Sequence, residues 1–212
     1  MSLILAIRAN GKAYFCSDRR VLCGAVIKRE QDKLFVLISK KDGSDTDIVV
    51  GICGAARFLT LIADPRNQHM VKELYKENPT IYGLVDSIVA MFEKNGTEAE
   101  KDPGNQGSYN LRMVIGYGED LYEVSRDLVI YKVPPTDLAT GGSGGLIASA
   151  FWAGKDHMPG AITPVLEGDD LARAIDDVNR RRLQEVFDYV ARVDSGVGPT
   201  IDFYSYDLKL TA

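Results

Sequence analysis

The sequence contains little of what several common kinds of protein chemistry require. Its 212 residues include only two histidines, His69 and His157, and three cysteines that form no Cys-x-x-Cys pair. A histidine-based zinc site or a Ser-His-Asp triad would need both histidines or borrowed ligands, so we expect neither. No apolar stretch approaches the roughly 20 residues of a membrane-spanning helix. We therefore expect no metal, no cofactor and no membrane partner.

An excess of positive charge is also missing. The chain carries 25 Lys and Arg residues against 30 Asp and Glu residues, for a net charge of −5. This balance disfavours binding to nucleic acid or to an anionic membrane. The segment before Arg8 is too short and lacks the basic start of a secretory signal peptide. The chain has an odd number of cysteines, Cys16, Cys23 and Cys53, which is typical of a reducing compartment. We therefore expect a cytoplasmic protein.

The residues that are present have the balance of a globular protein. Hydrophobic residues make up 45% of the chain and charged residues 26%, which is typical of a soluble domain. This length predicts one domain over residues 1–212. Such a domain buries roughly 70% of the surface of its unfolded chain, so its stability requires no disulfide or metal.

The distribution of apolar residues predicts a mixed α+β fold. The runs 2–8 and 12–18 flank Asn10-Gly11, the strongest short hairpin signal. Apolar runs predict further strands at 20–27, 33–38, 48–53, 109–117, 120–125, 128–133 and 200–208. Helical spacing predicts helices at 54–64, ended by Pro65, and at 80–94, 146–153 and 169–191. Runs of strands alternating with pairs of helices favour two stacked, mainly antiparallel sheets covered by helices over a doubly wound fold.

Ser2 is the first candidate for a catalytic residue. Removal of Met1 would leave a serine that carries both a hydroxyl group and a free α-amine. An α-amine has a pKa of about 7.7–8.0, so it can act as a general base at neutral pH. Many proteins begin with Met-Ser, so Ser2 taken alone indicates no more than an ordinary chain start. In a hairpin that turns at Asn10-Gly11, Asp18 is expected to lie beside Ser2.

Three other features become informative in combination with Ser2. Asp18 is followed by two arginines, which is also typical of a surface ion-pair cluster. Lys33 begins an apolar strand, where its charge would favour a deprotonated amine nearby or would simply discourage aggregation. The segment 51–56 (GICGAA) is expected to join a strand to a helix. Such a joint exposes backbone N–H groups that can form an oxyanion hole, or it is only a tight turn.

Together these residues resemble the proteasome β-subunit family, which includes the HslV-type peptidases and other bacterial proteasome-like proteins. These are N-terminal-nucleophile (Ntn) hydrolases. The segment 2–20 (SLILAIRANGKAYFCSDRR) is similar to the family's nucleophile, first hairpin and Asp-x-Arg pair. The segment 142–145 (GSGG) is similar to the family's Gly-Ser-Gly-Gly. The resemblance implies a four-layer αββα sandwich. It implies catalytic roles for Ser2, Asp18, Lys33, Gly54 and Ser143, and substrate-binding roles for Arg20, Val21, Leu22 and Ala56.

The sequence departs from the family pattern in several places, including a longer hairpin at 39–47. Serine replaces the usual threonine at position 2, so the methyl group that helps to fix the hydroxyl rotamer is missing. The spacing from Asp18 to Lys33 is one residue shorter than usual. Near the chain end, the family's Asp-x-x-Ser-Gly is replaced by the segment 192–196 (RVDSG). Either Asp194 or Ser195 can align with the pattern, and the roles of Arg192, Asp194 and Ser195 stay open.

The resemblance implies that the protein hydrolyses peptide bonds with Ser2 inside a self-compartmentalised homo-oligomer. Its substrate would be a peptide or an unfolded protein, and an ATP-dependent unfoldase is a partner by analogy only. Two alternatives remain. A structural subunit would keep the fold without the chemistry, and a small-amide hydrolase would act on acyl amides instead of peptides. Retention of Met1 would block the Ser2 amine and favour the structural subunit.

Overall fold

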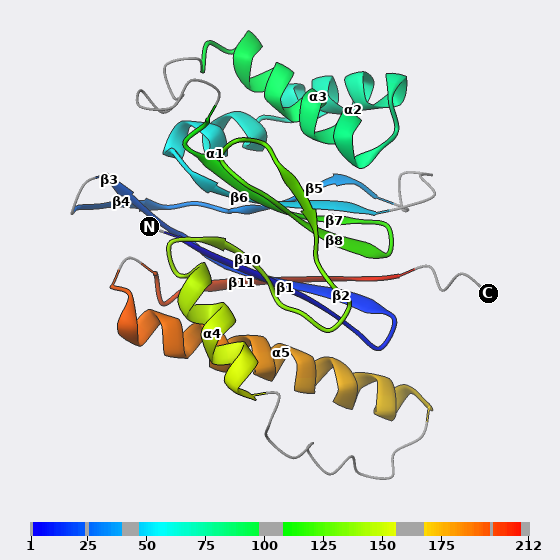
Figure 1. Cartoon of the computed structure of the whole chain (residues 1–212), viewed down its shortest axis with the longest axis vertical. Coiled ribbons are helices and arrows are strands. Elements are labelled where there is room, and N and C mark those ends of the chain that lie inside the picture. The colour runs from blue at the N-terminus through cyan, green and yellow to red at the C-terminus, as the bar shows by residue number, and fades with distance from the viewer. Residues whose placement is uncertain are drawn as a thin grey trace.

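The computed structural model describes residues 2–23, 26–39, 47–97, 108–155, 168–195 and 197–208. The described residues form four layers (Figure 1). Helices α1, α2 and α3 cover one face of a pair of stacked sheets, and helices α4 and α5 cover the opposite face. The layers are therefore helix, sheet, sheet and helix, as the sequence predicts.

The first sheet has the strand order β10-β1-β2-β11, and all its neighbours are antiparallel. Its strands are β1 (Leu3–Ala9), β2 (Lys12–Asp18), β10 (Ala139–Gly142) and β11 (Ile201–Asp207). Asn10 and Gly11 form the turn between β1 and β2 with positive φ angles of 51° and 74°. Two positive φ angles are what a two-residue hairpin turn of the preferred type requires. The turn sets the predicted register, in which Ile4 pairs with Ser17.

The second sheet has the order β5-β6-β7-β8-β9 and is also antiparallel. Its strands are β5 (Leu34–Ile38), β6 (Ile48–Gly54), β7 (Leu111–Tyr117), β8 (Asp120–Val124) and β9 (Ile130–Lys132). A separate ribbon pairs β3 (Arg20–Cys23) with β4 (Val26–Glu30). The prediction of one strand over 20–27 was therefore wrong. An uninterrupted apolar run carries no periodicity that marks a reversal of the chain.

The helices are α1 (Ala56–Ala63), α2 (Pro65–Glu77), α3 (Ile81–Lys94), α4 (Gly145–Lys155) and α5 (Gly168–Val193). Helix α2 was not predicted, because Pro65 was interpreted as the end of a helix. In the structure Pro65 occupies the start of α2, and the Asp64 carboxylate accepts the backbone N–H of Arg66 at 2.9 Å. Proline fits this position because the N–H it lacks has no partner within the helix.

The three core clusters explain why β1 is apolar along its whole length. Leu3 and Leu5 pack against the layer of α4 and α5, whereas Ile4 and Ala6 pack between the two sheets. Both faces of β1 are therefore buried, and a strand buried on both faces has no polar alternation. A third cluster lies between the five-stranded sheet and helices α1 to α3.

Strand β10 ends with Gly141 and Gly142, the first residues of the glycine cluster 141–145, whose last residue, Gly145, begins α4. It pairs with β1 so that Gly142 lies opposite Leu3. Gly142 has a φ of 92°, and a Cβ atom there would lie 2.0 Å from the carbonyl oxygen of Ser2. Glycine is required at this position because a side chain would overlap the start of β1. The cluster thus combines the end of a short strand, which packs closely against Ser2, with the entry to a helix.

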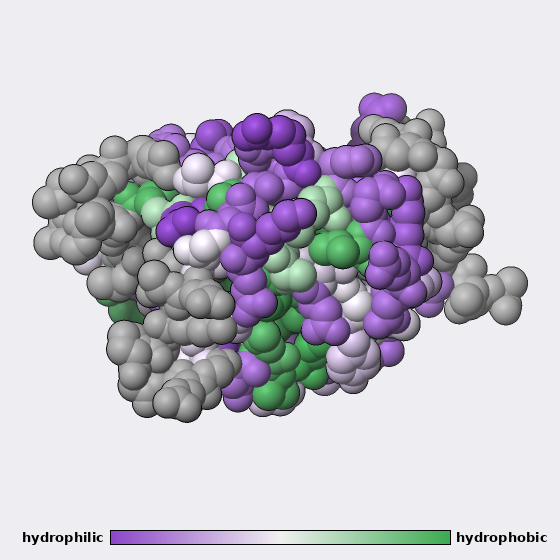
Figure 2. All heavy atoms as spheres, turned by 90° about the horizontal axis from the view of Figure 1, so that it is seen from above, coloured by the Kyte–Doolittle hydropathy of each residue, from purple (hydrophilic) through white to green (hydrophobic). Residues whose placement is uncertain are grey.

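Figure 2 shows the molecule from above, with the layer of α1 to α3 toward the viewer. Hydrophilic residues cover most of the described surface on this face, and hydrophobic residues reach it only in patches. Among the described residues, no helix has both the length and the apolar composition needed to cross a membrane.

Candidate active site

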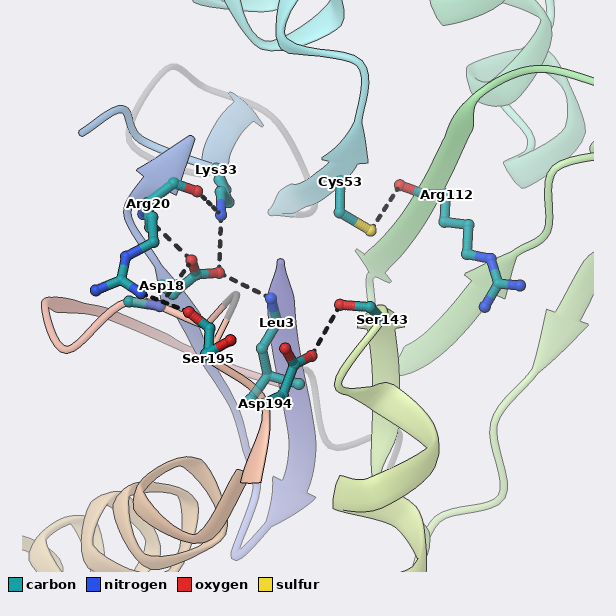
Figure 3. A network of polar contacts seen from close by, with 10 residues as sticks. Leu3, Asp18, Arg20, Lys33, Cys53, Arg112, Ser143, Asp194 and Ser195 are labelled. Carbon is teal, nitrogen blue, oxygen red and sulfur yellow. Dashed lines mark hydrogen bonds and ion pairs between the residues drawn. The ribbon is translucent and has the colours of Figure 1, made fainter. Parts of the chain in front are cut away.

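A buried polar cluster surrounds the Asp18 carboxylate at the end of β2 (Figure 3). Its Oδ1 atom accepts the backbone N–H of Leu3 at 2.7 Å and the Lys33 ammonium group at 2.8 Å. Its Oδ2 atom accepts the backbone N–H groups of Arg20 and Gly198 at 3.2 and 3.3 Å. The side chains of Asp18 and Lys33 are both fully buried. Four donors therefore compensate a carboxylate that lies away from water.

Lys33 is held in this cluster by a second acceptor and by its own backbone. Its Nζ atom also donates to the carbonyl oxygen of Arg20 at 2.7 Å, and its carbonyl oxygen accepts the N–H of Ile52 at 2.9 Å. Burial lowers the pKa of the Lys33 amine below its usual value, although the Asp18 carboxylate opposes this effect. The ammonium group is thus a fixed charge whose proton is easier to remove than that of an exposed lysine.

Ser2 directly precedes β1, and its peptide bond to Leu3 is held from both sides. The N–H of Leu3 donates to Asp18, and the carbonyl oxygen of Ser2 accepts the N–H of Gly144 at 3.4 Å. The Ser2 side chain lies beside a cavity of about 660 Å³. The hairpin, the polar cluster and the glycine cluster therefore position Ser2 at the wall of this cavity.

The cavity lies between the start of α4 and the adjoining ends of β6 and β7. Its wall is made of Ser2, Cys53, Gly54, Asn110, Leu111, Arg112, Arg126, Gly142, Ser143 and Leu146. Three of the predicted catalytic residues, Ser2, Gly54 and Ser143, thus border one space. Within the described part of the chain, no group of three or more His, Cys, Asp or Glu side chains could hold a metal ion.

Gly54 ends β6 in a conformation that only glycine adopts readily. Its φ is 140°, and a Cβ atom would lie 2.0 Å from the carbonyl oxygen of Asn110. The next residue, Ala55, donates its N–H to that same carbonyl at 2.9 Å. The joint between β6 and α1 is therefore tight, and its backbone borders the cavity that Ser2 also borders.

Ser143 connects the cavity to the end of α5. Its hydroxyl group donates to the carboxylate of Asp194 at 3.0 Å. Ser195 offers its backbone carbonyl to the Arg20 guanidinium group at 2.7 Å. Arg192 instead donates to a carbonyl group one turn earlier in α5, at 3.2 Å. Of the two alignments left open by the sequence, the structure therefore brings Asp194, not Arg192, to Ser143.

Of the residues that the resemblance assigned to substrate binding, Arg20, Val21 and Ala56 are not part of this cavity wall. Arg20 contacts the polar cluster, because its backbone N–H donates to Asp18 and its guanidinium group donates to the carbonyl oxygen of Ser195. Val21 and Ala56 pack against the core between the five-stranded sheet and helices α1 to α3. The side chain of Leu22 lies outside the described residues. A substrate-binding role for these four residues stays a prediction.

Several cavity residues were not found from the sequence, among them Cys53, Arg112 and Arg126. Cys53 is only 3% exposed, and burial raises the pKa of its thiol to about 12. Its Sγ atom donates to the carbonyl oxygen of Arg112 at 3.6 Å. One signal was available, since Arg112 is the only charged residue of the otherwise apolar strand β7.

Neither a protein-family model nor a curated protein matches this chain. Several solved structures do. HslV from Trypanosoma brucei is 15% identical with a TM-score of 0.59, and the match covers 97% of this chain and 99% of that one. BPH from Thiobacillus denitrificans, solved in complex with epoxomicin, is 14% identical with a TM-score of 0.60 over 98% and 100% of the two chains. The chain has the fold of the proteasome-like Ntn hydrolases.

A further match has the same fold. A Gly-1 mutant of Anbu from Hyphomicrobium sp. strain MC1 is 14% identical with a TM-score of 0.60, over 98% of this chain and 83% of that one. The α+β class and the four-layer αββα arrangement implied by the resemblance are confirmed. The agreement extends over nearly the whole Ntn-hydrolase fold, although few residues are shared.

Proposed function

We propose that this protein is a peptidase that hydrolyses peptide bonds with the hydroxyl group of Ser2 after removal of Met1. The observation that carries the proposal is the shared acceptor Oδ1 of Asp18, which binds both the Lys33 ammonium group and the N–H of Leu3. This bond links a buried positive charge to the residue that follows Ser2. The Ntn-hydrolase fold and the cavity beside Ser2 support the same conclusion.

In this proposal each group of the site has a defined role. The Ser2 Oγ atom attacks the carbonyl carbon of the substrate while the Ser2 α-amine, directly or through a water molecule, accepts the hydroxyl proton. The Lys33 charge favours the unprotonated amine, and Asp18 orients Lys33. The N–H of Gly54 stabilises the negative oxygen of the tetrahedral intermediate. The leaving amine takes the proton, and water then hydrolyses the acyl ester on Ser2.

Ser143 and Asp194 are positioning residues in this scheme. Their hydrogen bond joins the glycine cluster, which packs on Ser2, to the end of α5. The homo-oligomer is also part of the proposal: residues 1–212 form one domain, and several copies enclose the sites in a ring-like chamber in the cytoplasm. A chamber would limit access to peptides and unfolded chains, and an ATP-dependent unfoldase could deliver them.

Intact mass spectrometry of the untagged protein, before and after treatment with epoxomicin, tests the proposal. The inhibitor is chosen because the BPH structure contains it. We expect a mass that lacks one methionine, and an epoxomicin adduct on Ser2 that abolishes hydrolysis of an unstructured peptide. Ser2→Ala is expected to lose both adduct and activity, whereas Ser2→Thr keeps a hydroxyl group and is the matched control.

Other outcomes favour the alternatives. Retention of Met1 in the active assembly, or undiminished activity in Ser2→Ala, would contradict the mechanism. Turnover of small acyl amides without turnover of peptides would favour an amidohydrolase. A processed chain in a large assembly with neither activity would favour a structural subunit, and size-exclusion chromatography with light scattering measures the assembly.

A further inference from the structure

Two arginines make the cavity beside Ser2 positive. Among the described residues of its wall, Arg112 and Arg126 are the only charged ones, and none carries a carboxylate. Neither guanidinium group forms an ion pair or a hydrogen bond with any side chain that the structure describes. We call these two residues the arginine wall.

Some arginines in the described part of this chain have carboxylate partners, whereas others, such as Arg181 and Arg182 on the exposed face of α5, have none. Arg8 pairs with Asp120 at 2.8 Å, and Arg19 pairs with Asp32 at 2.8 Å. Carboxylates are plentiful, since the net charge is −5. An unpaired arginine on a convex surface needs no explanation, because water solvates it. Two unpaired arginines on one concave wall form a binding site for an anion.

The position of Arg112 in β7 determines on which side of the strand its side chain lies. Val114 packs between the two sheets, so Arg112, two residues earlier in β7, faces the same side of the strand. Cys53 pairs with Arg112 across β6 and β7. Figure 3 shows the Arg112 side chain extending from β7 on the side where Ser143 lies, whereas Lys33 and Asp18 lie on the opposite side of Leu3.

Arg126 comes to the same wall from a different segment. Its carbonyl oxygen accepts the N–H of Tyr109 at 2.7 Å, which ties the segment after β8 to the residues just before β7. The backbones at both arginines are therefore held, while both side chains are exposed. The start of α4 at Gly145 adds positive potential from its helix dipole at the opposite wall.

We propose that the arginine wall binds a carboxylate of the substrate, so that the protein acts on peptides that carry a negative charge close to the scissile bond. This inference rests on the proposed peptidase function. A guanidinium group offers a planar fork of donors that matches the two oxygens of a carboxylate. The carboxylate can be an acidic side chain or a free C-terminus. Leu146, which is 84% exposed in the same wall, would contact an adjoining apolar part of the substrate.

Matched peptides test this proposal. One series replaces Gln by Glu at each position around the cleaved bond, and a second compares a C-terminal amide with the free acid. Binding to full-length Ser2→Ala is measured by calorimetry, and hydrolysis by the unmodified protein is measured in parallel. We expect one charged peptide to bind on the order of tenfold more tightly than its neutral partner, as for a charge-assisted hydrogen bond. The preference should decrease as salt is added.

The preference should disappear in Arg112→Gln/Arg126→Gln. The matched control is Arg181→Gln/Arg182→Gln, which removes the same two charges from exposed positions on α5 that do not line the cavity. This control is expected to keep the preference. The position at which Glu acts, or the free C-terminus, identifies the source of the carboxylate.

The result separates the two proposals. Hydrolysis of charged and neutral peptides with equal efficiency and equal binding would overturn the carboxylate site and leave the peptidase standing. Binding that prefers the charged peptide, without hydrolysis of any peptide by the unmodified protein, would overturn the peptidase and retain the site. Equal loss of preference in the control variant would show that net charge alone, not the arginine wall, attracts the peptide, and would overturn the site.

Discussion

The polar cluster around Asp18 and the arginine wall both carry charged side chains, but the first is buried and paired whereas the second is exposed and unpaired. In the polar cluster, Asp18 and Lys33 are fully buried, and four donors surround the carboxylate. In the arginine wall, Arg112 and Arg126 are exposed and have no partner among the described residues. The polar cluster is complete within the chain, whereas the arginine wall is completed only by water or by a bound anion.

The difference follows from the cost of burying charge. A buried ion without a partner is strongly destabilising, so each group in the polar cluster needs a partner if the fold is to keep its full stability. An exposed guanidinium group keeps its hydration, so leaving it unpaired costs the fold little. We infer that the polar cluster maintains the geometry of the site and that the arginine wall is available to bind a ligand. The predictions below test this contrast, starting with the largest effect.

Removing the centre of the polar cluster should have the largest effect. Asp18→Ala leaves the Lys33 ammonium group buried without its carboxylate and leaves three backbone N–H groups without an acceptor. We expect a loss of about 3–5 kcal/mol in the free energy of unfolding, measured with urea. Asp32→Ala is the control, because it removes an exposed partner of Arg19 and should cost less than about 1 kcal/mol. Similar losses in both variants would refute the contrast.

Removing Lys33 should cost less stability and more activity. In Lys33→Met the Asp18 carboxylate keeps three N–H donors, so we expect a loss of about 1–3 kcal/mol. If the protein is the proposed peptidase, hydrolysis should fall to background while the chain stays folded by circular dichroism. Lys132→Met, which removes an exposed partner of Asp120, should retain activity. An active Lys33→Met variant would remove Lys33 from the mechanism.

The pH dependence of stability should show the burial of Lys33. Because burial lowers the pKa of Lys33 in the folded chain, the unfolded chain binds more protons at any pH between the folded value and the unfolded one. Stability contributed by this group therefore rises with pH up to about 10.4, with a slope of at most about 1.4 kcal/mol per pH unit. The stability difference between the natural chain and Lys33→Met should grow in this direction. A difference independent of pH would contradict the lowered pKa.

The smallest effect is expected at the arginine wall. Arg112→Gln/Arg126→Gln should change the free energy of unfolding by no more than about 0.5 kcal/mol per residue, because neither side chain has a partner to lose. Thermal and urea unfolding both measure this. A large destabilisation would show that the arginines hold the fold, and would remove the basis of the contrast.

The local half of the site could be predicted from the sequence. The Asn10-Gly11 turn determines the register of β1 and β2, and that register brings Asp18 to the start of β1. The apolar length of β1 indicated a strand buried on both faces, and the helical spacing of 80–94 indicated α3. These features depend on neighbours within a few residues, where turn chemistry and periodicity act directly.

Predictions failed where one residue type has two local roles. Pro65 follows the end of α1 and also begins α2, so it has both local roles, and the sequence interpretation gave it only the first. Strand β10, which ends in Gly141 and Gly142, was not predicted, because it forms only by pairing with the edge of β1. Pairing with a strand more than 130 residues away leaves no trace in local periodicity.

The sequence by itself determined the α+β class, with stacked sheets covered by helices, and the pairing of the chain start with Asp18, because a turn and a hydrophobic pattern act over short distances. Only the tertiary structure decided that Asp194 is the residue that reaches Ser143, and that Arg112 and Arg126 face the cavity beside Ser2. Those residues come from segments far apart in the chain. Their meeting depends on how the sheets stack and on where β7 extends past the core, which is a property of the packed layers and not of any one segment.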